Sequence, residues 1–281
     1  MLNAKGELEG LSDWPAQKLT RARTLGKELK ADVDAFGAAG HFYAEVEARP
    51  DHFGADIVMH VREKPPLAEY SLRLGEIIHN TRSALDSMLW EVAGLGGASA
   101  SKRGMVTYPA NLHVNEWTAD RQRDEGHNSG LSVTLDATVL ERVKSTQPFA
   151  QSGDAKLDGL AAIARLSNYD KHRGMVATLG VPTSMRLELP LHRVKDPKYN
   201  ELDGDLKIDN IAEWALVDGL HTQRFAWSVP MTIEDGLRLD IPWHWAIADP
   251  QLSSTIPLDA VLLMPDHAEA VMHYVRTGSW P

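Results

Sequence analysis

The sequence of 281 residues contains no cysteine. This absence excludes disulfide bonds, thiol nucleophiles and thiolate-ligated metal sites, so a metal would have to be held by histidine and carboxylate side chains. No apolar run approaches the roughly 20 residues that a membrane-spanning helix needs, and the opening "MLNAKGELEG" lacks the apolar core of a secretory signal. We therefore expect a cytoplasmic protein that does not contact the membrane.

Positive charge is also scarce, since 29 Lys and Arg face 39 Asp and Glu, for a formal net charge of -10. A broad basic face is what generic nucleic-acid binding normally needs, so this composition disfavours it, although a local basic pocket is left open. The motifs of the common cofactor and hydrolase sites are missing too: there is no glycine-rich dinucleotide loop after a strand, no Walker loop and no His-Glu-x-x-His. We expect neither a cofactor nor a metal.

What the chain does have is a hydrophobic content of 43%, enough for one large domain or two closely packed ones. Capping residues, proline near the first turn and glycine at the end predict helices at residues 12–38, 67–94, 136–146 and 154–173. A short strand at "TYP" (107–109) and a short helix in "NEWTADRQRDE" (115–125) are expected within a segment, residues 95–130, that we predict to be mobile.

Strand formers flank the five-residue loop "PDHFG", which predicts a β-hairpin of residues 41–49 and 55–63. After residue 174, short β-rich runs such as "MVATLGV", "MRLELPLHRV", "EWALVDG" and "RFAWSVP" predict an antiparallel sheet, and "DHAEAVMHYVRTG" predicts a final helix. The fold class is therefore α+β: a helical bundle with an N-terminal β-hairpin, followed by a C-terminal antiparallel β-rich region and a final helix. We expect two regions: a helical core, residues 1–173, which includes the hairpin at 41–63, and a β-rich region with the C-terminal helix, residues 174–281. The two regions are expected to pack together as one unit.

The second long helix carries polar side chains on one face, because they are spaced by three or four residues: Glu76, His79, Arg82, Ser83 and Asp86. The simplest interpretation is a solvated face in which Arg82 and Asp86 form an ordinary ion pair, worth about 0.3–0.5 kcal/mol. However, Leu72 and Trp90 lie on the same face and predict that another element covers it. Glu76 and His79 match one half of a carboxylate-bridged di-iron site. A second such pair is missing, and a single metal held by His79, His172 and a carboxylate is left open.

A second polar stripe, Arg165, Asn168, Tyr169 and His172, lies on a helix that is otherwise apolar around much of its circumference. Buried polar groups need partners, because an unpaired one costs on the order of 1–3 kcal/mol. The His79 and Arg82 face is the best partner in the chain, so we expect the two stripes to face each other. Lys171 and Arg173, by contrast, are explained by the helix end before Gly174.

Three segments, "GEIIHNTRSALDSMLWEVAG", "QPF" and "LAAIARLSNYDKHRG", resemble an uncharacterised family of mainly actinobacterial proteins. The recurring text of that family is His-Asn-x-Arg-Ser-Ala-Leu-Asp, then Gln-Pro-Tyr/Phe, then Asn-x-Asp-Lys-His-Arg, and the resemblance covers about residues 40–180. It locates a shared site without naming a reaction. The site residues that it implies are His79, Asn80, Arg82 and Asp86 on one side, and Asn168, Asp170, Lys171, His172 and Arg173 on the other.

A weaker resemblance is to HEPN domains, which are helical ribonucleases and nucleotide-binding modules marked by an arginine, four to six residues, and then a histidine. Arg165 and His172 have this spacing, whereas Leu166 stands where HEPN domains usually have a polar residue. This resemblance implies metal-independent RNA cleavage.

The functional prediction is a binding module for a small anionic, phosphate-bearing ligand or a partner protein, through a His/Arg/Asn site between two helices. The alternative is a HEPN-like ribonuclease or nucleotide-processing enzyme, in which Arg165 holds a phosphate and His172 and His79 exchange protons. A third interpretation is a purely structural polar network. Whether the protein forms a homodimer is left open.

Overall fold

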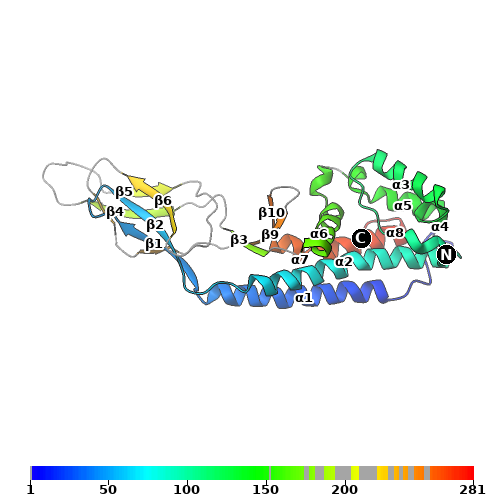
Figure 1. Cartoon of the computed structure of the whole chain (residues 1–281), viewed down its shortest axis with the longest axis horizontal. Helices are drawn as coiled ribbons and strands as arrows, with labels where there is room; N and C mark the ends of the chain where they lie inside the picture. The colour runs from blue at the N-terminus through cyan, green and yellow to red at the C-terminus, as the bar shows by residue number, and fades with distance from the viewer. Residues whose placement is uncertain are drawn as a thin grey trace. The chain divides into compact units, whose positions relative to one another are not determined.

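The computed structural model describes residues 2–151, 153–173, 177–180, 187–193, 204–208, 220–226, 231–233, 237–239, 244–249 and 254–281 (Figure 1). The side chains of His172 and Arg173 lie outside this description, as does the strand expected at 213–219. The chain divides into two compact units. The helical unit comprises Met1–Leu29, Ala68–Val176 and Asp249–Pro281, and the β unit comprises Lys30–Leu67 and Ala177–Ala248.

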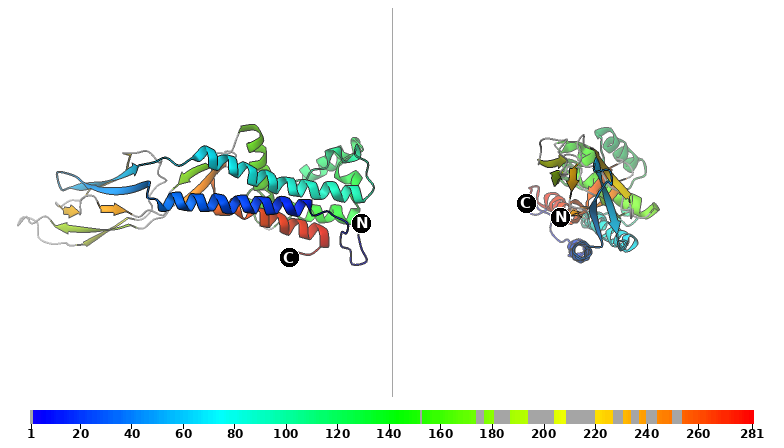
Figure 2. Two further views of the ribbon diagram at one scale, coloured as in Figure 1. Left: turned by 90° about the horizontal axis from the view of Figure 1, so that it is seen from below. Right: turned by 90° about the vertical axis from the view of Figure 1, so that its left-hand side faces the viewer.

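The helices of the first unit follow the predicted order. Its elements are the first part of α1 (Trp14–Ala38), most of α2 (Leu67–Leu95), η1 (Lys102–Met105), α3 (Val114–Gly126), α4 (Leu131–Thr134), α5 (Ala137–Ser145), η2 (Pro148–Ala150), η3 (Ala155–Leu157), α6 (Gly159–Arg173), β10 (Ser254–Pro257), α7 (Leu258–Leu262) and α8 (Met264–Thr277). Within this unit, residues 14–29 of α1 run alongside α2, as Figures 1 and 2 show. The core is built mainly from α2, whose largest fully buried side chains are Leu74, Ile77, Ile78, Leu85, Met88 and Leu89.

Local capping chemistry sets the helix ends. Asp136 accepts a hydrogen bond from the Thr138 N–H at 2.8 Å and so begins α5. Asp158 does the same for α6, accepting from the Leu160 N–H at 2.8 Å. The predicted start at residue 154 is therefore wrong: a separate turn, η3, precedes the capping residue. At the other end of the chain, Gly278 adopts a φ of 81° and ends α8.

The β unit confirms the hairpin. Strands β1 (Phe42–Ala48) and β2 (Gly54–Val61) pair with Ala48 opposite Ala55, and Asp51 stabilises the loop between them by accepting from the Phe53 N–H at 2.9 Å. The hairpin is the centre of a sheet of order β6-β2-β1-β8, in which β6 is Leu220–Ala226 and β8 is Leu237–Leu239. The other described strands also pair antiparallel: β4 (Leu187–Arg193) with β5 (Gly204–Ile208) and β7 (Met231–Ile233), and β3 (Ala177–Gly180) with β9 (His244–Asp249).

The α+β fold class is thus confirmed, but the division of the chain differs from the boundary expected after residue 173. The hairpin groups with the later strands, since β1 pairs with β8 and β2 with β6. A two-stranded hairpin is marginal by itself in water, and the added strands complete its sheet. Conversely, α8 packs on α5 and α6, so the final helix belongs with the helical unit.

The strand expected at "TYP" is absent: residues 106–110 belong to no helix or strand of the described part of the chain. Side chains take the place of a β-ladder there. The Tyr108 N–H donates to Asp86 Oδ1 at 2.7 Å, and the Asn111 N–H donates to Gln147 Oε1 at 3.1 Å. The ring of Tyr108 is fully buried, with its hydroxyl 2.6 Å from Thr146 Oγ1. The helix expected at 115–125 is confirmed as α3.

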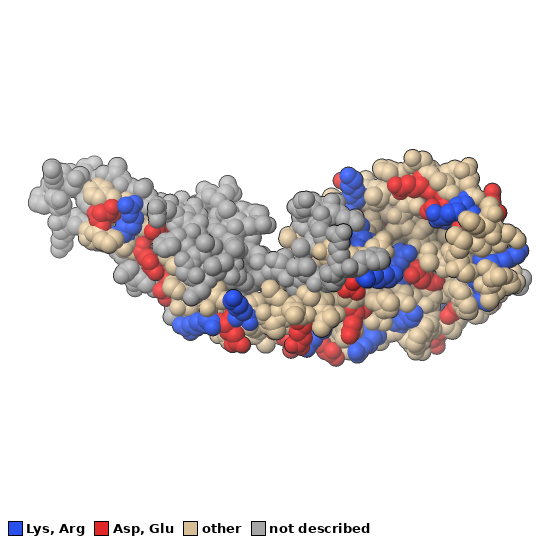
Figure 3. Space-filling model, in the orientation of Figure 1, with Lys and Arg blue, Asp and Glu red and all other residues tan. Residues whose placement is uncertain are grey.

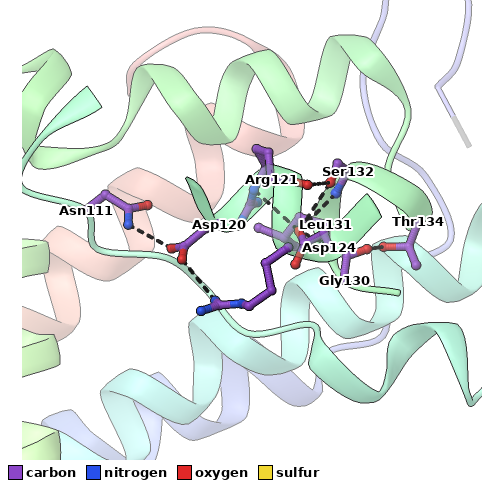
Figure 4. A network of polar contacts seen from close by, with 9 residues as sticks. Asn111, Asp120, Arg121, Asp124, Gly130, Leu131, Ser132 and Thr134 are labelled. Atoms are coloured by element: carbon purple, nitrogen blue, oxygen red, sulfur yellow. Dashed lines mark hydrogen bonds and ion pairs between the residues drawn. The ribbon is translucent and has the colours of Figure 1, made fainter. Parts of the chain in front are cut away.

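A buried carboxylate organises the turn between α3 and α4 (Figure 4). Asp124 accepts from the N–H groups of Leu131 at 2.9 Å and Ser132 at 3.3 Å, and Arg121 Nε lies 3.4 Å away. Gly130 has a φ of 82°, and a Cβ built on it would lie 2.2 Å from Asp124 Oδ1. Only glycine fits at this position. The mobility expected of residues 95–130 stays a prediction, although this network and the buried Trp117 lie within them.

No helix in the described part of the chain combines the length and the apolar composition needed to cross a membrane.

Candidate functional site

The polar face of α2 lies where the helical spacing placed it, but it is less covered than expected. Glu76 and His79 are exposed, whereas Arg82 and Asp86 are partly buried. Leu72 is 72% exposed, so the prediction that an element covers the whole face is wrong at that end. The face is thus open at Leu72, Glu76 and His79 and partly covered at Arg82 and Asp86.

Arg82 and Asp86 together bind one segment, residues 106–110. Arg82 Nη2 donates to the Tyr108 carbonyl and Asp86 accepts from the Tyr108 N–H, while Arg82 Nη2 and Asp86 Oδ1 lie 3.4 Å apart. Burial of the Tyr108 phenol raises its pKa. Arg82 Nη1 is buried and has no hydrogen-bond partner among the described residues. The pair is therefore more than a solvated ion pair, because it fixes the path of the chain beside α2.

Lys18 approaches the same helix from α1. Its Nζ donates to Ser83 Oγ at 2.5 Å and Ser87 Oγ at 2.9 Å, and lies 5.3 Å from the centre of the Trp14 ring. Burial lowers the pKa of Lys18, and the nearby Asp86 carboxylate opposes that shift. Sequence reasoning missed Lys18, although two serines one turn apart on the polar face were a usable sign of a donor from a neighbouring helix.

A pocket of about 340 Å³ lies beside these groups. We call it the Trp14–Trp90 pocket; its lining residues are Trp14, Asp86, Ser87, Trp90, Glu91 and Val106. The two indoles are 55% and 46% exposed, unusual for tryptophan in a folded unit. Of the six lining residues, only Asp86 was predicted as a ligand-binding residue; Trp90 was noted only for its place on the helix face.

Both the aromatic and the acidic walls of this pocket are held in place. The Arg103 guanidinium stacks 3.9 Å from the centre of the Trp90 ring. Glu91 accepts from the Ser12 N–H at 2.8 Å and from Ser12 Oγ at 2.6 Å, which ties the start of α1 to α2. Walls that are fixed before a ligand arrives reduce the ordering cost of binding.

The second stripe does not face α2 as a whole. Asp170 does: a Cβ built on Gly75 would lie 2.6 Å from Asp170 Oδ1, and Gly75 shares the helix face of His79 and Arg82. Five residues on a helix turn through about 140°, so Arg165 points away from that contact. Its Nη1 instead donates to the Lys156 carbonyl at 2.7 Å, in η3.

The prediction of a buried stripe is wrong for Asn168, which is exposed, as is Lys171. Asn80 uses its amide locally, donating to the Glu76 carbonyl at 2.8 Å. The roles predicted for the side chains of His172 and Arg173 fall outside the described residues. The structure thus brings Arg82, Asp86 and Asp170 to one face of α2, next to the exposed His79, and places Arg165 elsewhere.

Charge is mixed around the site. On the face of the helical unit seen in Figure 3, basic and acidic side chains are interspersed and form no continuous basic patch. In the described part of the chain, no three or more His, Asp and Glu side chains are grouped so that they could hold a metal ion.

Comparison with protein-family models, with curated protein sequences and with solved structures finds no match to the chain.

Proposed function

We propose that the protein is a binding module for a small ligand that combines a flat aromatic ring with an anionic group, of which a nucleoside monophosphate is the simplest example. The site is the Trp14–Trp90 pocket. The observation that carries the proposal is Lys18: within the described part of the chain its ammonium is hydrogen-bonded to two hydroxyls and to no carboxylate. One of these hydroxyls belongs to Ser87 of the pocket wall, and the ammonium lies 5.3 Å from the centre of the exposed Trp14 ring.

The aromatic walls favour a planar ligand. Stacking of a base on an aromatic side chain is worth about 1–3 kcal/mol, and two indoles flank this pocket. A volume of about 340 Å³ lies within the range typical of small-molecule sites, about 300–1,000 Å³. Exposed tryptophans otherwise cost solubility, so their placement at one pocket favours a binding role over a role in the core.

Lys18 supplies the anion site. A charge-assisted hydrogen bond from its ammonium to a phosphate contributes about 1.5–3 kcal/mol. An anion also offsets the burial that lowers the Lys18 pKa, because it favours the charged form. Asp86 and Glu91 then accept N–H groups of the ring. Arg82 already offsets part of the charge of Asp86, and Ser12 donates a hydrogen bond to Glu91.

Arg82, which lies in one of the segments that resemble the uncharacterised family, keeps a role in this proposal. It binds the Tyr108 carbonyl and so fixes the segment that contributes Val106 to the pocket wall. The alternative, RNA cleavage by His79 and His172 with Arg165 on the phosphate, stays a prediction, and Arg165 lies away from the α2 face. The cytoplasmic location and a homodimer likewise stay predictions.

Calorimetric titration of the whole protein with AMP, GMP, CMP and UMP tests the proposal. We expect Lys18→Gln to weaken AMP binding about tenfold, equivalent to about 1.4 kcal/mol, and to leave adenosine binding unchanged. Lys27→Gln, an exposed lysine on the same helix, is the matched control. We expect Trp90→Ala to weaken the binding of both AMP and adenosine.

Trp280→Ala is the control for Trp90, since Trp280 is similarly exposed at 47% but stacks on Tyr274. The proposal would be refuted if none of the four nucleotides showed saturable binding at millimolar concentration. It would also be refuted if the control variants lost as much binding as the Lys18 and Trp90 variants. Incubation of RNA with wild type and His79→Ala in EDTA tests the alternative, which requires cleavage by the wild type alone.

A further inference from the structure

The Asp86 carboxylate of the Trp14–Trp90 pocket has an oxygen that the described part of the chain leaves unused. Asp86 Oδ1 accepts from the Tyr108 N–H at 2.7 Å and lies 3.4 Å from Arg82 Nη2. Asp86 Oδ2 accepts no hydrogen bond from any described residue. The side chain lines the pocket and is 30% exposed, so a ligand in the pocket can reach the carboxylate.

The charged groups next to Asp86 are already engaged. Both oxygens of Glu91 accept from Ser12, one from its N–H at 2.8 Å and the other from its Oγ at 2.6 Å. The Lys18 ammonium donates to two serine hydroxyls and makes no hydrogen bond to Asp86 within the described part of the chain. What Asp86 lacks is a hydrogen-bond donor, because an ionised carboxylate has acceptor sites only.

The edge of a base decides whether it can supply that donor. A base that stacks on an indole directs its polar groups outward in the plane of its ring, toward the other walls of the pocket. Guanine carries two neighbouring donors on one edge, N1–H and the 2-amino group, and these match the two oxygens of a carboxylate. Adenine and cytosine carry an amino group beside a ring-nitrogen acceptor, and uracil carries one N–H between two carbonyls. An acceptor that faces a carboxylate is repelled, so these three bases fit Asp86 less well.

We propose that the Trp14–Trp90 pocket selects guanine nucleotides, with N1–H and the 2-amino group donating to Asp86 while Lys18 holds the phosphate. One donor is accepted by Oδ2, and the other by the second lone pair of Oδ1, beside the bond from Tyr108. This inference rests on the proposed function, because it assigns the base specificity of the same site.

Calorimetric titration of the wild-type protein with GMP, IMP and AMP tests the base preference without any substitution. We expect GMP to bind about tenfold more tightly than AMP, or better, because one hydrogen bond to a charged group changes affinity by at least about that factor. IMP has N1–H but no 2-amino group, and it should bind about tenfold more weakly than GMP. Lys18→Gln should weaken GMP and AMP by the same factor, since it acts on the phosphate.

The variant Asp86→Asn tests the residue to which the preference is assigned. The amide keeps an oxygen for the Tyr108 N–H and replaces Oδ2 by an amino donor, so that it complements adenine rather than guanine. We expect the ratio of GMP affinity to AMP affinity to fall from about ten or more to about one or less. Asp259→Asn, the same change at an exposed position of α7, should leave this ratio unchanged.

Equal binding of GMP, IMP and AMP by the wild type, each still weakened by Lys18→Gln and by Trp90→Ala, would overturn the guanine assignment and leave the proposed function standing. A preference for GMP that survives in a folded Asp86→Asn variant, checked by thermal melting, would also overturn it. Absence of binding of every nucleotide would overturn both. If Asp86→Asn does not fold, the wild-type comparison of the three nucleotides still decides the base preference.

Discussion

Replacement of Gly130 by alanine tests whether the buried Asp124 carboxylate fixes the turn between α3 and α4. The new Cβ would lie 2.2 Å from Asp124 Oδ1, at a backbone φ of 82° and ψ of -166°. That backbone region is essentially restricted to glycine, and strain there costs of order 1–3 kcal/mol. The carboxylate must also move away from the N–H groups that it caps.

Those N–H groups, of Leu131 and Ser132, would then lose their acceptor in a buried place, at about 1–3 kcal/mol for each unsatisfied donor. We expect Gly130→Ala to lower the free energy of unfolding by about 3–5 kcal/mol, a large part of the about 5–15 kcal/mol that typical domains have. Urea denaturation followed by far-ultraviolet circular dichroism measures this. Gly126→Ala is the control, because a Cβ there meets nothing within 4 Å.

A double-mutant cycle separates the clash from the backbone strain. In an Asp124→Ala background the clash is gone, so we expect Gly130→Ala to cost less there than in the wild type, by about 1–3 kcal/mol. If the two substitutions are additive, or if Gly130→Ala costs less than about 1 kcal/mol alone, then the Asp124 carboxylate does not determine this turn.

Three further predictions concern other contacts. Arg142→Ala should lower the free energy of unfolding by about 2–4 kcal/mol, since the guanidinium donates to the carbonyls of Gly6, Val275 and Arg276 and leaves them without this partner; thermal melting measures the loss. Tyr108→Phe should lower the free energy of unfolding, measured by urea denaturation, by about 1–2 kcal/mol, because the hydrogen bond to the Thr146 hydroxyl is lost. Lys18 makes the free energy of unfolding depend on pH in the alkaline range. Because its pKa is lowered on folding, the unfolded state binds more protons between that pKa and the ordinary lysine value of 10.5, so the free energy of unfolding should rise with pH in this window. Urea titrations up to pH 10.5 should show that rise in the wild type and a smaller one in Lys18→Met.

Features set by neighbours along the chain were predictable. The hairpin loop, the long helices and the polar face of α2 follow from turn residues, caps and helical spacing, all of which act within a few residues. The start of α6 was misplaced because two capping aspartates, at 154 and 158, precede the helix and the sequence alone does not choose between them. Each accepts from the N–H two residues later.

Features that depend on distant residues were not predictable. Residues 107–109 have the composition of a strand, but their backbone is bound by Asp86 and Arg82, more than 20 positions earlier, instead of by another strand. The Lys18 contact with Ser87 spans 69 positions, and no spacing rule covers it. Helical periodicity placed Arg165 on a stripe but could not say which element that stripe meets. The β-hairpin likewise gives no sign that its partners lie near residues 220 and 239.

The interleaving of the two units determines when each can finish folding during synthesis. The hairpin ends at Val61 and leaves the ribosome long before β6 and β8, with which it pairs. Its β2 edge therefore waits unpaired for about 160 residues of further translation and its β1 edge for about 175. The helical unit waits longer still, because the Leu8 N–H bonds to the Arg276 carbonyl and α8 supplies part of its core. Neither unit can be completed until residues far later in the chain have been made. Strand edges and apolar helix faces of the nascent chain should therefore stay exposed until residues 220–276 have left the ribosome.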